Sequence, residues 1–321
     1  MNTTDIEKKY LNFPQEKKKA QGFHLVLHLM ISLSLFLPAL LLAYFQKTPG
    51  LQVRWKTMRM GFRHFIHNQN LRLLFHLVVK PLDSVRYFEF DFMLGRAQKS
   101  DALEACLDVS SPRLLAAFWY RAFPNANITL INPDVLDMQE TKKFVQDMRI
   151  ADRCRLDNKL LEMAQFEANS FDLISCMSVL EHIPDDTQAV KRMWNLLRPG
   201  GKLLITIPCH RKQYEEYTNL DDYKLFESDK NGYVFWQRFY DELRLNRHIF
   251  CITGLPSYQA IYAENKAGFY DQNVIEKRSK FPYAFWYEPL MMGKNFSFFA
   301  KIDDLPGMGI IGLEFVKPLS K

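Results

Sequence analysis

The sequence predicts an α/β protein in which a doubly wound, mostly parallel sheet follows an apolar and basic N-terminal segment. Between residues 103 and 207, short apolar runs alternate with stretches of helical spacing, which is typical of strands joined by crossover helices. The segment Phe23–Phe45 contains no charged residue. The chain has 321 residues, of which 48% are hydrophobic, enough to build a core, so the composition excludes a largely disordered chain.

Positive charge is concentrated near the N-terminus. The formal net charge of the whole chain is +6 at pH 7, and residues 1–82 sum to +9, which leaves −3 for the remainder. The stretch Lys47–Lys80 contains seven Lys and Arg residues and no Asp or Glu. Because apolar residues are interleaved with these charges, the pattern favours an anionic membrane surface as partner. We expect no nucleic-acid partner, although a basic segment leaves that weaker alternative open.

The five cysteines indicate neither a disulfide framework nor a metal centre. They are odd in number and widely spaced, and they form no C-x-x-C pair. No histidines cluster with them at zinc-ligand spacing, so we expect no metal site. We interpret the cysteines as reduced thiols of a cytosolic domain.

The apolar segment Phe23–Phe45 is long enough to cross a membrane. At a rise of about 1.5 Å per residue, a helix of this length spans about 34 Å, against a hydrocarbon layer of about 30 Å. A cleaved signal peptide fits less well, because the apolar run is long and residues 42–46 offer no A-x-A site. Lysines and arginines flank the segment on both sides, which leaves its orientation open. If both flanks are cytoplasmic, Pro38 could bend the segment into a shallow re-entrant insertion.

The next segment, residues 51–79, has the pattern of a helix at a membrane interface. Aromatic residues and Met58 recur at helical spacing between Trp55 and Phe65, and basic residues lie beside them. The alternative is that this segment packs on the globular domain. We therefore predict a basic tail (1–22), a membrane anchor with amphipathic helices (23–82) and a globular domain (83–321) with an insertion at about 211–250.

Within the globular domain, strands and helices alternate in order. Parallel pairing through right-handed crossovers would bring the carboxyl ends of the strands to one edge of the sheet, where ligands bind in such folds. The predicted strands are Leu103–Val109, Asn127–Ile131, Phe171–Met177 and Lys202–Ile207, with a weaker one near Asp152–Leu156, and the predicted helices are Leu114–Phe123, Val135–Met148 and Asp185–Leu197.

One stretch resembles a known family. Ser170–Pro208, SFDLISCMSVLEHIPDDTQAVKRMWNLLRPGGKLLITIP, resembles the second half of class I S-adenosylmethionine-dependent methyltransferases, with a strand, a V-L-E-H-I helix start and an R-P-G-G-x-L turn. The likeness extends over about residues 83–317, with Gly309–Lys317 as a final antiparallel strand. It implies a Rossmann-like methyltransferase fold with a seven-stranded sheet, and S-adenosyl-L-methionine as cofactor.

The resemblance also implies cofactor-binding residues. The family's first motif, an acidic residue and a glycine-rich turn, corresponds to Asp108–Arg113, where every glycine is missing. The small hydroxyls at these places would bond the carboxylate or amine of the cofactor. Where the family has an acidic residue for the ribose, this chain has an amide, which accepts a hydrogen bond more weakly. An acidic position beside the adenine falls within Asp157–Glu162. The implied cofactor-binding residues are Asp108, Ser110, Ser111, Asn132, Met177 and Ser178.

Candidates for catalysis follow the strand ends. Glu181, His182 and His210 lie where the pocket is expected, and His210 could deprotonate a hydroxyl near neutral pH. For both histidines, ordinary packing is the alternative. Arg86 and Glu89 precede the sheet as possible pocket groups. The insertion could form a substrate lid, and its aromatic cluster at 235–240 has helical spacing, which indicates a packed helix.

The predicted function is S-adenosylmethionine-dependent methyl transfer to a small, lipid-soluble or membrane-presented acceptor. The protein would be membrane-associated, with its catalytic domain facing the cytoplasm. The alternative is a catalytically inactive, membrane-bound interaction module, because the family's glycines are missing. No G-x-G-x-x-G follows any strand, which disfavours a dinucleotide-dependent oxidoreductase. The acceptor and the oligomeric state are not specified by the sequence.

Overall fold

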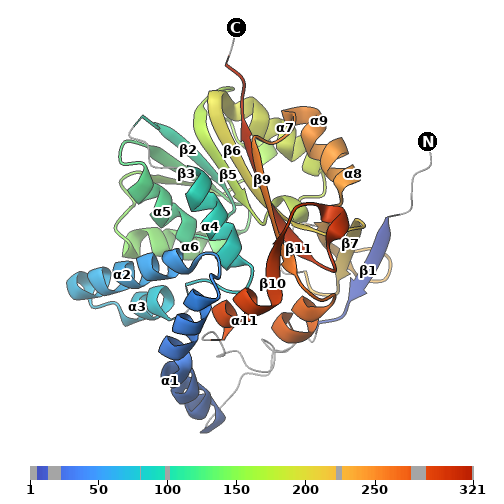
Figure 1. Cartoon of the computed structure of the whole chain (residues 1–321). Coiled ribbons are helices and arrows are strands. Elements are labelled where there is room, and N and C mark those ends of the chain that lie inside the picture. Colours follow the sequence, from blue (N-terminus) through green and yellow to red (C-terminus); the bar gives the residue numbers. More distant parts are fainter. Residues whose placement is uncertain are drawn as a thin grey trace.

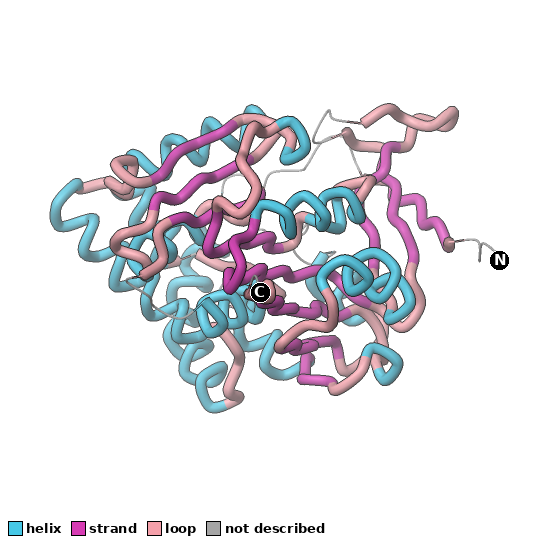
Figure 2. Tube along the Cα trace, turned by 90° about the horizontal axis from the view of Figure 1, so that it is seen from above, coloured by secondary structure: helices cyan, strands magenta, loops and turns pink. Residues whose placement is uncertain are grey.

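The computed structural model describes residues 6–13, 23–79, 81–97, 102–221, 226–275 and 287–319. Its centre is a sheet with the strand order β10-β9-β11-β6-β5-β2-β3-β4. Helices cover both faces of this sheet (Figures 1 and 2). The predicted α/β fold with a mostly parallel sheet is confirmed.

The parallel part of the sheet matches the predicted strands closely. It consists of β2 (Ala105–Val109), β3 (Asn127–Ile131), β4 (Cys154–Asp157), β5 (Phe171–Met177) and β6 (Leu197–Cys209). Except for the edge strand β4, these strands have most of their residues buried, as expected where helices cover both faces.

Three further strands complete the sheet. β11 (Gly309–Val316) lies between β6 and β9 (Tyr258–Glu264) and is antiparallel to both. β10 (Phe296–Phe299) pairs with β9 at the edge. In the described part of the chain the sheet therefore has eight strands, one more than the seven expected.

Two hydrophobic cores lie on opposite faces of the sheet. One contains residues of α4 (Arg86–Ala97), α5 (Leu114–Ala122) and α6 (Val135–Asp147). The other contains residues of α7 (Asp186–Leu196) and of a later segment that includes α8 (Glu242–Leu245) and α9 (Cys251–Thr253). Aspartates cap the N-termini of α6 and α7, where Asp134 and Asp185 accept hydrogen bonds from backbone amides.

The N-terminal helices are docked on the globular domain. α1 (Phe23–Phe45) contacts α11 (Glu288–Asn295), and it projects from the rest of the molecule in Figure 1. α2 (Leu51–Asn68) packs on α3 (Leu71–Val78) and on α4. Residues of all three helices belong to the same core as α4 and α5. The helical spacing predicted between residues 51 and 79 is confirmed, and so is the alternative that these helices pack on the domain.

The expectation of a transmembrane helix at residues 23–45 is not supported. Over the residues that the structure describes, no helix combines the length and the apolar character that crossing a membrane requires.

The insertion forms strands where its aromatic residues predicted a helix. β7 (Tyr214–Thr218) pairs antiparallel with β8 (Val234–Phe239) and parallel with β1 (Glu7–Leu11), which lies in the predicted basic tail. The prediction of a helix across residues 235–240 is therefore wrong. The aromatic residues lie on β8, and antiparallel pairing of β8 with β7 outweighs their local spacing.

We predict that Gly312→Ala destabilises the protein, because its Cβ would lie 2.5 Å from Cδ2 of the buried Phe92. Overpacking of this kind costs about 1–3 kcal/mol in the free energy of unfolding. The matched control is Gly95→Ala in α4, where a Cβ meets no described atom within 4 Å. Urea denaturation of the control should show a free energy of unfolding that is unchanged or up to about 1 kcal/mol higher.

Candidate functional site

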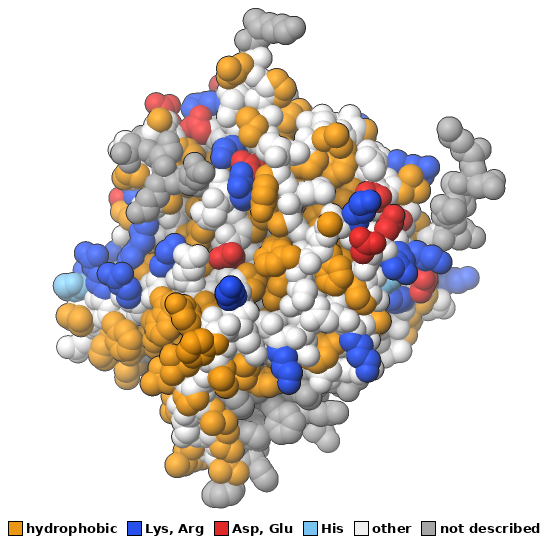
Figure 3. Space-filling model, in the orientation of Figure 1, with side chains coloured by type: hydrophobic (Ala, Val, Ile, Leu, Met, Phe, Trp, Pro, Cys, Tyr) orange, Lys and Arg blue, Asp and Glu red, His pale blue; other side chains and the backbone are white. Residues whose placement is uncertain are grey.

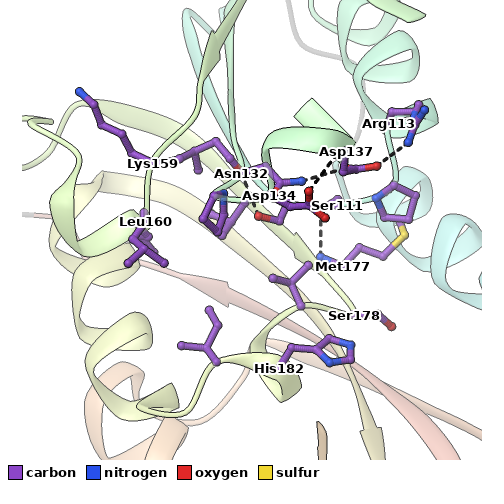
Figure 4. Close-up of a pocket in the computed structure, with 18 of the residues that line it drawn as sticks. Ser111, Arg113, Asn132, Asp134, Asp137, Lys159, Leu160, Met177, Ser178 and His182 are labelled. Carbon is purple, nitrogen blue, oxygen red and sulfur yellow. Dashed lines mark hydrogen bonds and ion pairs between the residues drawn. The ribbon is translucent and has the colours of Figure 1, made fainter. Parts of the chain in front are cut away.

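A cavity of about 540 Å³ lies at the carboxyl ends of β2, β3 and β5 (Figure 4). Small-molecule sites typically measure roughly 300–1,000 Å³. The wall also includes Pro81, Arg86 and Phe226, the last of which comes from the insertion. The cavity thus occupies the edge of the sheet where the sequence predicted a ligand. The rest of the wall comes from the segments 109–114, 131–134, 159–162, 177–179 and 182–184, together with Asp137.

The turn after β2 keeps a glycine-like backbone although it contains no glycine. Ser110 has a φ of 51°, in the left-handed region that glycine adopts most easily. Its backbone amide donates a hydrogen bond to the carbonyl oxygen of Ile131 (2.8 Å), and its hydroxyl donates another to the same oxygen (3.1 Å). The serine therefore holds the turn in place, and its hydroxyl proton is already used within the protein.

Asp108 and Ser111 connect the end of β2 to β5. Asp108 is buried beneath the wall and accepts a hydrogen bond from the hydroxyl of Ser175 (2.6 Å). Burial raises the pKa of Asp108 to about 6, although hydrogen bonds from Ser175 and Ser111 oppose that change. The hydroxyl oxygen of Ser111 accepts a hydrogen bond from the amide of Met177 (3.0 Å). Both predicted cofactor residues thus stabilise the floor of the cavity, and of the two only Ser111 reaches its wall.

At the end of β3, the exposed carboxylate is supplied by Asp137. The side-chain oxygen of Asn132 accepts a hydrogen bond from the amide of Asp134 (2.9 Å), and its Nδ2 donates to Asp137 Oδ2 (2.8 Å). Arg113 forms an ion pair with the same carboxylate (Figure 4). Sequence reasoning selected Asn132 and missed Asp137. The available signal was the helix start at Asp134, because side chains in the first turn point back toward the strand end.

The acidic position expected within residues 157–162 is occupied in the wall by Glu162. Asp157 lies outside the wall, where its carboxylate is 3.8 Å from the ammonium group of Lys159. Lys159 and Leu160 do line the cavity. Of the two acidic residues in that range, Glu162 is therefore the one that lines the cavity.

Met177 and Ser178 lie in the wall, as the resemblance implied, and a buried carboxylate holds Ser178. Ser178 has a φ of 48°, and its hydroxyl donates a hydrogen bond to Glu89 Oε1. The same oxygen accepts from Thr206 (2.8 Å), and Glu89 Oε2 accepts from Arg86 (2.8 Å). Glu89 has no exposed surface, so Arg86 compensates its charge while itself facing the cavity.

Glu181 and His182 lie together beside Ser178. Glu181 is buried, and its Oε2 has no hydrogen-bond partner among the residues that the structure describes. Burial raises the pKa of Glu181 to about 8, and repulsion from Glu89 adds to this while Arg86 opposes it. His182 lines the cavity, and its Nε2 is 3.9 Å from Glu181 Oε1. A proton can therefore be held behind this part of the wall near neutral pH.

The tautomer of His182 follows from one contact. Its Nδ1 lies 2.6 Å from the carbonyl oxygen of Trp236. Since a carbonyl oxygen only accepts, Nδ1 carries the proton and Nε2 is the ring nitrogen that can take up another. Burial lowers the pKa of His182 to about 4, so the imidazole is neutral at pH 7.

His210 lies outside the cavity wall, so the structure does not bring it together with Glu181 and His182. Its Nδ1 is 3.0 Å from the carbonyl oxygen of Lys212, and its ring packs against Tyr214. The reason is that β6 runs on to Cys209, and the backbone of His210 is then bonded to Tyr240 of the insertion. In the part of the chain that is described, no three Cys, His, Asp or Glu side chains form a group that could hold a metal ion.

Comparison with known proteins finds similarity in the central region. Residues 107–205 match the family model of a methyltransferase domain. The ubiquinone biosynthesis O-methyltransferase of Xanthomonas axonopodis pv. citri is 44% identical over 130 residues, which are 40% of this chain and 52% of that protein. The chain therefore spans about half the length of this relative.

Two further proteins resemble this chain, one over a shorter stretch and the other at lower sequence identity. Phosphoethanolamine N-methyltransferase 2 of Caenorhabditis elegans is 32% identical over 114 residues, 36% of this chain and 23% of that protein. Among solved structures, the geranyl diphosphate C-methyltransferase of Streptomyces coelicolor has a TM-score of 0.45 at 10% identity, covering 72% of this chain and 78% of that one.

We predict that Glu181 makes the protein less stable as the pH rises. Its pKa is raised from 4.5 to about 8 in the folded state, so between these values the folded protein binds more protons than the unfolded chain. Relative to Glu181→Gln, the wild type should lose up to roughly one kcal/mol of unfolding free energy per pH unit from about pH 5 to 8. The control is Glu167→Gln, at an exposed position. Parallel pH profiles for the wild type and Glu181→Gln in urea denaturation would contradict the assignment.

Proposed function

We propose that this chain, whose residues 107–205 match the family model of a methyltransferase domain, is a class I S-adenosylmethionine-dependent methyltransferase that transfers a methyl group to a small, lipid-soluble or membrane-presented acceptor. One observation carries the proposal. The cavity at the carboxyl ends of β2, β3 and β5 is lined largely by this same domain, and it combines acceptors for a polar cofactor with a proton-holding pair.

The residues of the turn after β2 fit the methionine part of the cofactor. The left-handed backbone of Ser110 keeps the chain path that a glycine would provide. The hydroxyls of Ser110 and Ser111 are bonded within the protein, and so are their amides, to Ile131 and Asp108. Pro112 has no N–H, so we assign binding here to the backbone amide of Arg113. Asp137, with Asn132, is suited to accept hydrogen bonds from ribose hydroxyls, and Glu162 is suited to the adenine amine. When bound, the cofactor supplies an electrophilic methyl group on a sulfonium centre.

The acceptor is proposed to be an oxygen nucleophile. The name of the Xanthomonas relative specifies O-methylation in ubiquinone biosynthesis, which supports an oxygen on a lipid-soluble molecule. As the new bond from oxygen to the methyl carbon forms and the sulfur–carbon bond breaks, the hydroxyl proton must leave. His182 Nε2 would accept it at the wall, where Glu181 Oε1 lies 3.9 Å away.

We also propose that the protein is associated with a membrane, with this domain on the cytoplasmic side. The support is the basic and apolar character of residues 23–79. An acceptor that partitions into the bilayer would then be close to the cavity.

We predict that the purified protein binds S-adenosylmethionine and that Asp137→Asn weakens the affinity by about tenfold or more, because it removes the charge-assisted acceptor. Isothermal titration calorimetry measures both, with Glu167→Gln as the control that should bind like the wild type. If the wild type shows no binding at millimolar cofactor, the protein is instead an inactive, methyltransferase-like interaction module.

We predict that His182→Asn retains cofactor binding but lowers methyl transfer by about a hundredfold or more, because an amide cannot serve as a base. The Asn side chain can still donate to the carbonyl of Trp236, so the local fold should persist. The measurement is transfer of tritiated methyl from the cofactor into a membrane lipid extract from the source organism. His210→Asn is the comparison, and loss of activity in that variant alone would assign the base to His210.

A further inference from the structure

Three N-terminal helices expose apolar side chains where a folded monomer normally has polar ones. On α1, Leu33, Leu37 and Leu41 are 60%, 58% and 57% exposed, and their spacing of four residues places them on one side of the helix. On α2, Phe62 and Ile66 have the same spacing, and on α3 so do Leu71 and Phe75. We call these seven residues the apolar surface. Figure 3 shows hydrophobic side chains gathered over α2 and α3 and along α1.

The apolar surface is separate from the packing that holds these helices. A different side of α1 is buried through Phe36, Leu40 and Ala43, and α3 is buried through Leu73 and Leu77. The exposed side chains therefore contribute little to the core of the domain. Contiguous exposed apolar side chains of this kind mark a surface that binds an apolar partner.

The charges around the apolar surface indicate the chemistry of the partner that binds there. Residues 23–79 contain no Asp or Glu. Five cations in this segment are exposed, namely Lys47, Lys56, Arg59, Arg63 and Arg72. In Figure 3, basic side chains border the hydrophobic ones over α2. Apolar side chains flanked by Lys and Arg, without acidic residues, suit the boundary between the acyl chains and the anionic headgroups of a bilayer.

We propose that α1, α2 and α3 form one surface that lies in a single leaflet of an anionic phospholipid bilayer, parallel to the membrane plane. The apolar surface would contact acyl chains, and the five exposed cations would contact lipid phosphates and other anionic headgroups. These three helices would provide the surface for the proposed membrane association. Their relevance to catalysis rests on the proposed methyl transfer.

The arrangement also brings the bilayer beside the functional site. A second cavity of about 270 Å³ lies between α3 and α6, and Leu73 and Leu77 line it. Pro81, Arg113 and Leu114 line both this cavity and the larger one. The cavity beside α3 thus shares part of its wall with the proposed methyl-transfer cavity, which suits an acceptor delivered from the lipid phase.

The test is flotation of the full chain with vesicles of phosphatidylcholine alone and of seven parts phosphatidylcholine to three parts phosphatidylglycerol. The wild type should float with both and bind the anionic vesicles at least about tenfold more tightly, with that preference reduced by salt. The triple variant Leu33→Gln, Leu37→Gln, Leu41→Gln should bind both kinds at least about tenfold more weakly. The triple variant Lys56→Glu, Arg59→Glu, Arg63→Glu should lose the preference for anionic vesicles.

The matched control replaces three exposed leucines elsewhere, Leu243, Leu255 and Leu319, by Gln, and it should bind vesicles like the wild type. Equal vesicle binding by the wild type and the α1 triple variant would overturn the proposal. So would a wild-type oligomer that the α1 substitutions dissociate and that ignores vesicles, because the surface would then join copies of the chain. Calorimetry with S-adenosylmethionine on the same samples separates this outcome from failure of the proposed enzymatic function.

Discussion

The buried carboxylate of Glu89 holds together the side of the molecule on which the cavity forms. It lies on α4 and accepts hydrogen bonds from Arg86, from Ser178 after β5 and from Thr206 within β6. A buried charge without such partners would cost several kcal/mol, so these bonds fix α4 over the ends of two central strands. Arg86 and Ser178 face the cavity, and their positions therefore depend on a residue that never reaches it.

The floor of the cavity depends on a second set of internal bonds, which explains how serines can stand where the family has glycines. Ser110 keeps the left-handed backbone and bonds Ile131, while Ser111 bonds Met177. The turn is thus held by its own hydroxyls. Because these hydroxyls are bonded within the protein, the proposed recognition of a cofactor depends on the backbone amide of Arg113 and on the carboxylates of Asp137 and Glu162.

Much of the central fold could be predicted from the sequence, because it is encoded locally. The bounds of β3 and β5 are those of the apolar runs Asn127–Ile131 and Phe171–Met177, which polar or turn residues delimit. The sheet formed by β1, β7 and β8 could not be predicted in this way, because β7 pairs with β1, a strand near the N-terminus. The candidate site was likewise predicted only in part. Strand ends indicated Asn132 and His182 correctly as wall residues, but the wall does not include His210.

Burial shifts the pKa values of Glu181 and His182 in opposite directions, and both side chains become uncharged as a result. It raises the pKa of Glu181 to about 8 and lowers that of His182 to about 4, so both are largely uncharged at pH 7. Arg86, the cation beside them, is compensated by Glu89. The opposite part of the wall carries Arg113, Asp137 and Glu162. The cavity is therefore divided into a charged half that suits a polar cofactor and a nearly neutral half that admits an apolar acceptor without a large desolvation penalty. Such a half would suit the proposed acceptor from a lipid surface, because a charged wall would lose its hydration on contact with an apolar molecule.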